Sequence, residues 1–433
     1  MPLASLSAYL LAPVYAGPLR WLRVVYPLAM LVSTVRFVAR GWVQSHYLDT
    51  RFAFKYYGFA WVQTPPAWAL YSLHGLMVAA CLGMVATGWR LRPGKGFRAW
   101  ALVLFLSFTY VQLIDLTYYL NHYYLAALIA LLLAAVPQTF VNGKLPRWQL
   151  GIFRVQIGFV YVYAGLAKIN ADWLLNALPL KLWLPAHSGL PFIGPLLALP
   201  VTAYLFSWGG MVYDCLIPFA LMSRRLRWWA LGMVVVFHTL VGVLFPIGVF
   251  PLLMIVLAPV LMDNGQCIMN NRNPLLDAQC SIFEKSTLSI IHYALSIYLA
   301  IQILFPLRHW LYPGSVYWHE QGYRFSWRVM LMEKAGTATF YVRNTCTGRE
   351  GVADNRQFLN AMQEQQMATQ PDMILQFAHH LGRYYQRQSG CKQQVRCEAL
   401  VTLNGRPSRE LVDSKVDLMK VEDGMSDKGW VMK

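Results

Sequence analysis

Nine apolar stretches, separated by short polar or Gly- and Pro-containing breaks, make up most of the chain up to residue 305. A helix needs about 20 predominantly apolar residues to cross a hydrocarbon core of about 30 Å. Most of the stretches approach that length, and the fourth is short. The pattern therefore predicts a polytopic membrane domain of about nine helices, near residues 21–38, 67–89, 99–120, 121–137, 149–167, 200–222, 226–245, 247–262 and 287–305.

The seventh and eighth predicted helices come from one uninterrupted apolar run. Residues 228–262 contain no Asp, Glu, Lys or Arg, and one straight helix of this length would measure about 52 Å. That is too long for a single crossing. Phe245-Pro246-Ile247-Gly248 offers a break in the middle of the run. We therefore expect two helices joined by a tight hairpin.

The pattern changes to that of a small α+β domain after residue 305. Residues 337–344 alternate like a strand, residues 371–388 have helical spacing, and residues 395–403 and 409–418 are predicted to be strands around an Asn404-Gly405 turn. The fold class is thus mostly α. We expect an N-terminal interfacial segment at 1–20, a transmembrane helical domain at 21–305 and an extracytoplasmic α+β domain at 306–433.

Composition supports a membrane protein and excludes a nucleic-acid partner. Hydrophobic residues make up 57% of the chain and charged residues 13%, whereas a soluble domain carries about 25% charged residues. The net charge is +17, but the tail after Phe305 holds 17 Lys/Arg against 13 Asp/Glu. The remaining excess of basic residues lies among the apolar stretches, where such residues set orientation and meet anionic lipid. The expected partner is the lipid bilayer.

Basic loops indicate the orientation of the helices. Three short loops, near residues 90–98, 144–147 and 224–227, are rich in Arg or Lys, and all three lie on one side if nine helices alternate. The positive-inside rule then places the N-terminus in the cytoplasm and the tail outside it. The loop at 41–66, with Arg51 and Lys55, is a counter-signal. Absence of Asn-x-Ser/Thr sites favours a bacterial inner membrane.

Three cysteines lie in the predicted extracytoplasmic tail: Cys346, Cys391 and Cys397. Two of them could form a disulfide in an oxidising compartment, but the odd number leaves the choice of partners open.

Lys168 is the first candidate for chemistry, because it ends the apolar helix predicted at 149–167. A lysine at a helix end commonly extends along lipid to bring its amine to the interface. Alternatively, a partly desolvated amine with a lowered pKa acts as a general base. Gly165 and Ala167 favour close packing around this position.

Asn121 and His122 form a second candidate at the turn before the helix predicted at 121–137. The pair could polarise a ring hydroxyl or shuttle a proton, although an interfacial turn within an aromatic belt explains it equally well. Asp115 and Asp214 are acids in apolar stretches; they are expected to hold helices together by binding one another, Arg154 or Lys168.

The remaining histidines offer no metal site. His74 and His238 are interpreted as satisfied interior histidines, and we find no Cys/His cluster with metal-ligand spacing and no phosphate-binding loop.

The run from Gln156 through Lys168 to Trp173 resembles the signature helix of the vitamin K-dependent γ-glutamyl carboxylases, with their HTTM-like membrane domain. Further blocks in family order carry the same resemblance, from about residue 50 to residue 420. They are residues 113–115 and 121–123, Gly209-Gly210 with Asp214, residues 237–238 and 247–250, residues 302–306 and residues 321–327.

The resemblance implies an enzyme that carboxylates glutamate to γ-carboxyglutamate in a peptide or protein, with vitamin K hydroquinone, O2 and CO2 as co-substrates and no metal. Lys168 matches the lysine that deprotonates the hydroquinone. Asn121 and His122 match a pair at the reacting quinone. Tyr323 and Trp327 match a segment that helps receive the glutamate. A quinone reductase is the implied partner that recycles the vitamin K epoxide.

Several departures from the family keep alternatives open. Vertebrate members have a second lysine where this chain has Ala167, a histidine where it has Met332, and a long C-terminal extension. The quinone chemistry is therefore better supported than carboxylation of a protein. The alternatives are a hydroquinone epoxidase without protein carboxylation, and a non-catalytic lipid- or quinone-binding membrane protein.

Overall fold

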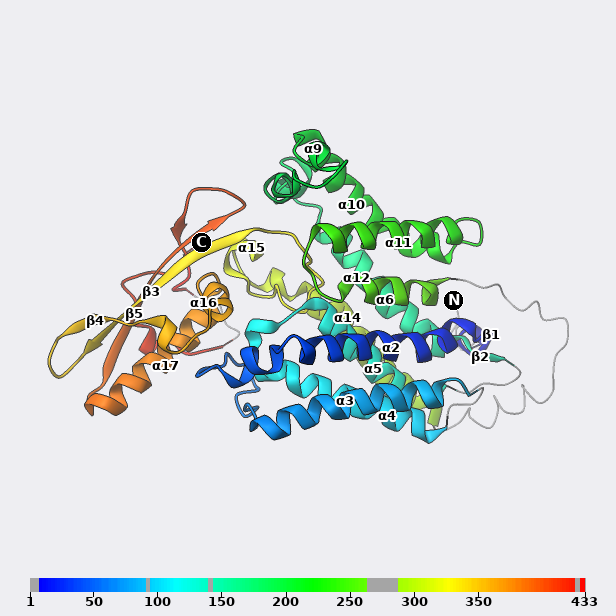
Figure 1. Ribbon diagram of the computed structural model, residues 1–433, viewed down its shortest axis with the longest axis horizontal. Helices are drawn as coiled ribbons and strands as arrows, with labels where there is room; N and C mark the ends of the chain where they lie inside the picture. The colour runs from blue at the N-terminus through cyan, green and yellow to red at the C-terminus, as the bar shows by residue number, and fades with distance from the viewer. Residues whose placement is uncertain (1–7, 91–93, 139–142, 263–286, 425–428, 433) are drawn as a thin grey trace.

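The computed structural model describes residues 8–90, 94–138, 143–262, 287–424 and 429–432. A helical bundle adjoins a smaller domain that contains a sheet, and the chain runs between them through the segment after α14 (Figure 1). The expected fold class is confirmed. The bundle helices are α2 (Gly17–Ala39), α3 (Ala67–Gly88), α4 (Lys95–Ile114), α5 (Asn121–Ala135), α6 (Arg147–Ala167), α10 (Pro200–Met222), α11 (Arg227–Leu244), α12 (Phe250–Leu261) and α14 (Thr287–Leu304).

Seven spans among the described residues are long and apolar enough to cross a membrane, and the shorter apolar helices α5 and α12 complete a set of nine. This agrees with the expected number. Proline marks several helix starts, where its missing N–H costs nothing: Pro18 in α2, Pro200 in α10 and Pro251 in α12. Gly248, with φ +67°, forms the predicted break between α11 and α12, because a residue without Cβ adopts this conformation freely.

The segment at residues 1–20, which we expected to be interfacial, contains a short strand and the start of α2. Residues 1–7 lie outside the described residues. Strand β1 (Pro13–Tyr15) pairs antiparallel with β2 (Lys144–Pro146), and α2 already begins at Gly17. This small sheet lies at the end of the bundle opposite the C-terminal domain, as does the loop between α10 and α11 (Figure 1). The basic loops therefore share one end of the bundle. Arg92, which belongs to one of these loops, is not among the described residues.

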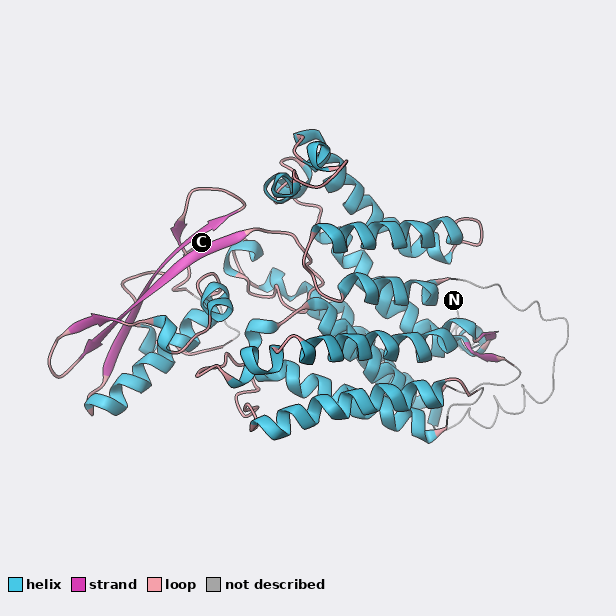
Figure 2. Ribbon diagram, viewed as in Figure 1, coloured by secondary structure: helices cyan, strands magenta, loops and turns pink. Residues whose placement is uncertain are grey.

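The C-terminal domain packs two helices against a four-stranded antiparallel sheet of order β4-β3-β5-β6 (Figure 2). Its strands are β3 (Lys334–Asn344), β4 (Glu350–Val352), β5 (Gln393–Leu403) and β6 (Arg409–Glu410), and its longer helices are α16 (Ala361–Met367) and α17 (Pro371–Ser389). The apolar face of α17 lies on the sheet, with the Phe377 ring 5.1 Å from that of Phe340. The predicted turn is present at Asn404 and Gly405, both with positive φ.

The predicted strand at residues 409–418 is wrong beyond its first two residues. Pairing continues only briefly after Glu410: Leu411 N–H donates to the carbonyl of Ala399 on β5, and Val412 forms an isolated bridge with Val431. The side chains of Leu411 and Val412 enter the domain core. Asp417 then accepts hydrogen bonds from the backbone N–H groups of Met419 and Val395, which supports a turn instead of a ladder. Local side-chain capping of this kind competes with strand pairing.

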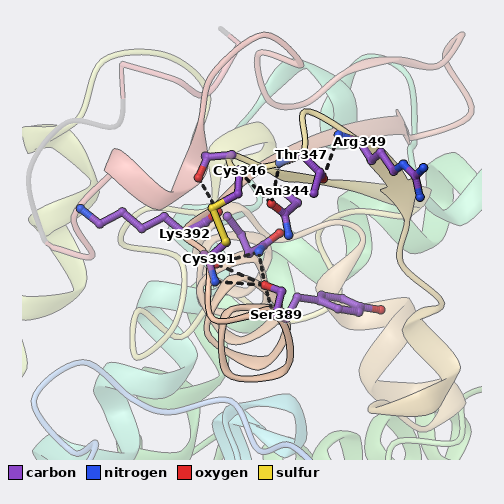
Figure 3. Close-up of a disulfide and its surroundings, with 10 residues drawn as sticks. Asn344, Cys346, Thr347, Arg349, Ser389, Cys391 and Lys392 are labelled. Atoms are coloured by element: carbon purple, nitrogen blue, oxygen red, sulfur yellow. Dashed lines mark hydrogen bonds between the residues drawn. A yellow bond between two sulfur atoms is a disulfide. The ribbon is translucent and has the colours of Figure 1, made fainter.

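A disulfide joins Cys346, in the turn after β3, to Cys391, which precedes β5 (Figure 3). It settles the pairing that the sequence left open. Cys397 is a free thiol buried in the sheet core.

The loop before α3 attaches the bundle to the C-terminal domain. Lys55 N–H donates to Oε1 of Gln376, whose amide nitrogen donates back to the carbonyl oxygen of Lys55, at 2.8 and 2.9 Å. Phe54 packs into the core of the C-terminal domain. The Lys55 amine binds the carbonyls of Val62 and Ile114. The charge of Lys55 is thus used within the protein, whereas Arg51, the other basic residue of the loop, is exposed.

Candidate functional site

Lys168 caps the C-terminal end of α6 and is 7% exposed. Its side chain turns back along the helix, with Nζ 3.3 Å from the carbonyl oxygen of Ala164 and 2.6 Å from Oδ2 of Asp214 on α10. The amine therefore lies inside the protein and is not extended to an interface. Of the partners considered for Asp214, the structure selects Lys168.

Close packing of α6 against α10 makes the pair possible. A Cβ on Gly165 would lie 2.6 Å from Sγ and 2.9 Å from the backbone N of Cys215, the residue after Asp214. Glycine is thus required for this approach. Trp173 strengthens the junction, because its Nε1–H donates to the carbonyl of Ser207 at 2.7 Å. The Trp173 ring centre lies 5.3 Å from the amine of Lys168, in range of a cation–π interaction.

Lys168 and Asp214 line a partly open cavity of about 100 Å³. Its walls come from α6, α10, α11 and α12 and from the segment before β3, and most of its lining is apolar. The aromatic and apolar lining residues include Val160, Trp173, Leu180, Phe206, Phe237, Val241, Phe245, Phe250, Met254, Val329 and Met330. A few polar groups in an apolar cavity are typical of a ligand site.

His238 lines the same cavity, which sequence reasoning missed. It is 2% exposed, and its Nε2 lies 3.4 Å from the hydroxyl of Tyr161, another lining residue. Its Nδ1 has no hydrogen-bond partner among the described residues. The expectation of a satisfied interior histidine is therefore wrong for His238. It is correct for His74, whose Nδ1 lies 2.8 Å from the carbonyl of Leu70.

Asn121 and His122 do not line the Lys168 cavity. The Asn121 amide donates to the carbonyl of Arg328 at 2.7 Å and accepts from the hydroxyl of Tyr119 at 2.8 Å. His122 is buried, and its Nε2 has no partner among the described residues. Its ring lies 5.8 Å from that of Phe250, a residue that lines the cavity.

Tyr323 and Trp327 belong to the segment at residues 320–330, which we call the strap. Trp327 is 1% exposed and stacks on Tyr124, with ring centres 5.0 Å apart. Tyr323 packs near Tyr317 at 6.4 Å between ring centres. Neither lines the cavity, but the strap reaches it through Val329 and Met330.

The strap holds an unusual backbone. Glu320, Phe325, Trp327 and Met330 all have φ between 54° and 59°. Such conformations cost about 1–3 kcal/mol each for residues with a side chain and persist where surrounding contacts enforce them. The contacts are present: Phe325 N–H donates to the hydroxyl of Tyr119 at 2.7 Å, in addition to the bond from Asn121 to the strap.

The C-terminal domain also touches the end of α6 directly. The hydroxyl of Tyr317 donates to the carbonyl of Ala167, next to Lys168, and accepts from the Arg328 guanidinium at 3.0 Å. Asp172, just beyond Lys168, accepts from Asn404 and Arg406, each at 2.8 Å. The Arg406 guanidinium holds the pKa of Asp172 below its usual range. The cavity thus lies where the bundle meets the C-terminal domain.

The arrangement brings an amine, a carboxylate, an imidazole and a phenol into one apolar enclosure. It can hold a ligand away from water and move a proton at Nζ of Lys168. The described residues contain no group of three or more His, Cys, Asp or Glu side chains placed to hold a metal ion.

Two family models match the chain. Residues 12–265 match the HTTM domain, and residues 287–433 match the lumenal domain of vitamin K-dependent gamma-carboxylase. No solved structure gives a significant match. The HTTM match alone spans more than half of the chain, and the two domains follow one another in a single polypeptide. The chain therefore belongs to the vitamin K-dependent gamma-carboxylase-like family of HTTM-domain membrane proteins.

Proposed function

We propose that this protein carboxylates glutamate to γ-carboxyglutamate, coupled to epoxidation of vitamin K hydroquinone, with Lys168 as the base that acts on the hydroquinone. The observation that supports this most is the Lys168–Asp214 pair, buried in an apolar cavity beside the domain matched to the gamma-carboxylase lumenal domain.

The lining of the cavity fits a reduced naphthoquinone. Aromatic and aliphatic side chains form walls suited to a fused ring, and the amine of Lys168 suits one of its oxygens. Reaction of the bound hydroquinone with O2 would supply a base strong enough to remove a γ-proton from glutamate, so that CO2 can add. The residues that would hold the ring are Lys168, Trp173, Phe237 and Phe250.

In its neutral form, Lys168 would accept a proton from a ligand hydroxyl on its Nζ lone pair, and the hydroxyl would be left as an oxyanion. Asp214, at 2.6 Å, stabilises the ammonium that forms, and the Trp173 ring adds a cation–π contact. Apolar walls strengthen both interactions by excluding water, because charges attract more strongly at low dielectric. The same exclusion protects reactive groups from quenching by water.

We assign reception of the Glu-containing peptide or protein to the face of the strap that carries Tyr323 and Trp327. Asn121 supports this region from α5, because its amide fixes the strap backbone at Arg328. A quinone reductase in the same membrane would recycle the cofactor.

We also propose that the N-terminus faces the cytoplasm and the C-terminal domain faces the outside of a bacterial inner membrane. Basic loops at the end opposite this domain support the orientation, as does the Cys346–Cys391 disulfide, which suits an oxidising compartment. After reduction of intact spheroplasts, a membrane-impermeant maleimide should label Cys346 from outside. Labelling only after lysis would reverse the orientation.

The central test is Lys168→Ala in purified protein with vitamin K hydroquinone, O2, CO2 and a Glu-containing peptide. Epoxide formation and incorporation of CO2 are measured separately. We expect both to fall at least 100-fold, since general-base catalysis contributes roughly 10²–10⁴-fold. Lys181→Ala is the matched control, because Lys181 lies at the same end of the bundle but binds the hydroxyl of Tyr204 outside the cavity.

The outcomes separate the proposed reaction from its alternatives. Equal epoxide from wild type and Lys168→Ala would refute the role of Lys168. No epoxide from wild type would favour a quinone- or lipid-binding protein. Epoxide without CO2 incorporation would favour an epoxidase, an alternative supported by the absence of Tyr323 and Trp327 from the cavity lining.

A further inference from the structure

The Lys168 cavity contains a second polar group that the proposed reaction leaves unused. His238 comes from the middle of α11 (Arg227–Leu244), and its ring is almost fully buried. A buried imidazole nitrogen without a partner costs free energy. In a cavity large enough for a ligand, an atom of that ligand is the natural partner for Nδ1.

Tyr161 gives the His238 ring a fixed direction. Its hydroxyl lies 3.4 Å from Nε2, so one ring nitrogen is engaged with α6, and the other is buried without a partner among the described residues. If the hydroxyl donates to Nε2, the neutral imidazole carries its hydrogen on Nδ1 and donates it to the ligand. The hydrogen bond at Nε2 thus determines whether Nδ1 donates or accepts a hydrogen bond.

Lys168 and Tyr161 are seven residues apart on α6 and so lie on the same face of the helix. The Lys168 amine turns back to the level of Ala164, within one turn of Tyr161. The amine and the Tyr161–His238 contact are therefore separated by roughly 5–10 Å along α6. One aromatic ring with an oxygen at each end bridges such a separation through a hydrogen bond at either end.

Aromatic walls favour a flat ligand between these groups. Phe237 and Phe250 both line the cavity, and the Phe250 ring centre lies 5.6 Å from that of His238. Aromatic rings attract one another in offset and edge-to-face arrangements.

We infer that His238 is a second ligand-binding residue of the Lys168 cavity. The cavity takes an aromatic ring with oxygens at opposite ends, one meeting Nζ of Lys168 and the other meeting Nδ1 of His238. This inference rests on the proposed function and deepens it: Lys168 selects the oxygen that loses its proton, and His238 fixes the orientation of the ring. A ring with one oxygen lacks the second contact.

Calorimetric titration under argon tests the inference with two probes, 1,4-dihydroxynaphthalene and 1-naphthol. We expect His238→Phe to weaken binding of the diol about 5–10-fold, as the loss of one hydrogen bond implies, and to leave 1-naphthol within twofold. Lys168→Ala should weaken both probes. His74→Phe is the matched control, because it replaces a buried histidine outside this cavity and should change neither affinity.

Two conservative variants distinguish ligand binding from packing. The side-chain amide of asparagine reaches the position of Nδ1, whereas that of glutamine extends toward the position of Nε2. His238→Asn should therefore retain diol binding within about threefold and His238→Gln should not. The pair also decides the matter if His238→Phe fails to fold.

Failure of the inference is distinguishable from failure of the proposed function. If wild type binds neither probe, the proposed function fails. If wild type binds the diol but His238→Phe and His238→Gln bind it equally well, the function stands and the role of His238 is refuted. Equal loss of diol and naphthol in His238→Phe would also refute it, since general damage to the cavity would be the cause.

Discussion

At the scale of single residues, the buried pair of Lys168 and Asp214 links stability to chemistry. Removing one partner of a buried pair leaves an uncompensated charge and costs about 3–5 kcal/mol, whereas replacing both with apolar residues is often neutral. We therefore expect Asp214→Leu to lower the free energy of unfolding by about 3 kcal/mol. The double variant Lys168→Met/Asp214→Leu should recover most of that loss in denaturant unfolding but remain without epoxidase activity.

The double variant separates two explanations of the pair. If the two charges serve catalysis and not folding, the double variant regains stability but has no epoxidase activity. A double variant as unstable as Asp214→Leu would show that the pair is needed for folding, and activity in the double variant would exclude Lys168 as the base.

Sequence reasoning found some of these residues but not their arrangement. Lys168 stood out because a lysine that ends an apolar helix is costly, and Asp214 because an acid within an apolar stretch needs a partner. Which partner Asp214 takes depends on the contact between α6 and α10. That contact brings Asp214 to Lys168, although the two residues are 46 positions apart in the chain. His238 gave no such signal, because an interior histidine is usually satisfied, and the unpartnered Nδ1 is found only once α11 packs against Tyr161.

At the scale of elements, the contact between α6 and α10 depends on Gly165. A methyl group there would meet the backbone N of Cys215 at 2.9 Å, so the helices must separate. We expect Gly165→Ala to cost about 1–3 kcal/mol by overpacking and to lower the epoxidation rate by lengthening the distance from Lys168 to Asp214. Thermal unfolding and initial rates of epoxide formation measure the two effects.

Gly158 provides the control on the same helix. A Cβ there meets nothing within 4 Å, so Gly158→Ala should be neutral or stabilising by about 0.5–1 kcal/mol through helix propensity. Equal effects of the two substitutions would contradict a specific role for Gly165 in the contact.

Elements could be predicted where one local pattern dominates. The membrane helices agree with expectation to within a few residues in most cases, because long apolar stretches and prolines mark them. Residues 409–418 alternate like a strand, yet pairing ends soon after Val412, and Asp417 caps a turn instead. Helix α16 was missed although Asn360 and Gln363 form a capping box, because its seven residues are too few for a clear periodicity.

At the scale of the whole molecule, the cavity is completed by contacts between residues far apart in the chain. Asn121 binds the backbone of Arg328, and Tyr317 binds that of Ala167, across 207 and 150 residues. No periodicity or motif predicts such pairs, because they depend on how two domains meet. The placement of Asn121 outside the cavity follows from the same junction, since its amide holds the strap.

The ion pair of Asp172 with Arg406 makes this junction sensitive to acid. Because Arg406 lowers the pKa of Asp172 in the folded protein, the pair stabilises the fold above the pKa of the unfolded carboxyl, about 3.9. Its contribution is lost as pH falls through the lower folded pKa. We expect the melting temperature of wild type to fall more steeply below about pH 4 than that of Asp172→Asn, which lacks the titrating group.

Asp49→Asn is the control, because Asp49 is exposed and bonds to neighbouring Gln44 instead of the C-terminal domain. It should leave the acid slope of wild type unchanged. If the melting temperatures of wild type and Asp172→Asn fall in parallel from pH 6 to the lowest pH measured, the ion pair does not stabilise the junction. In that case the bonds of Tyr317 and Asn121 would hold the two domains together without help from Asp172.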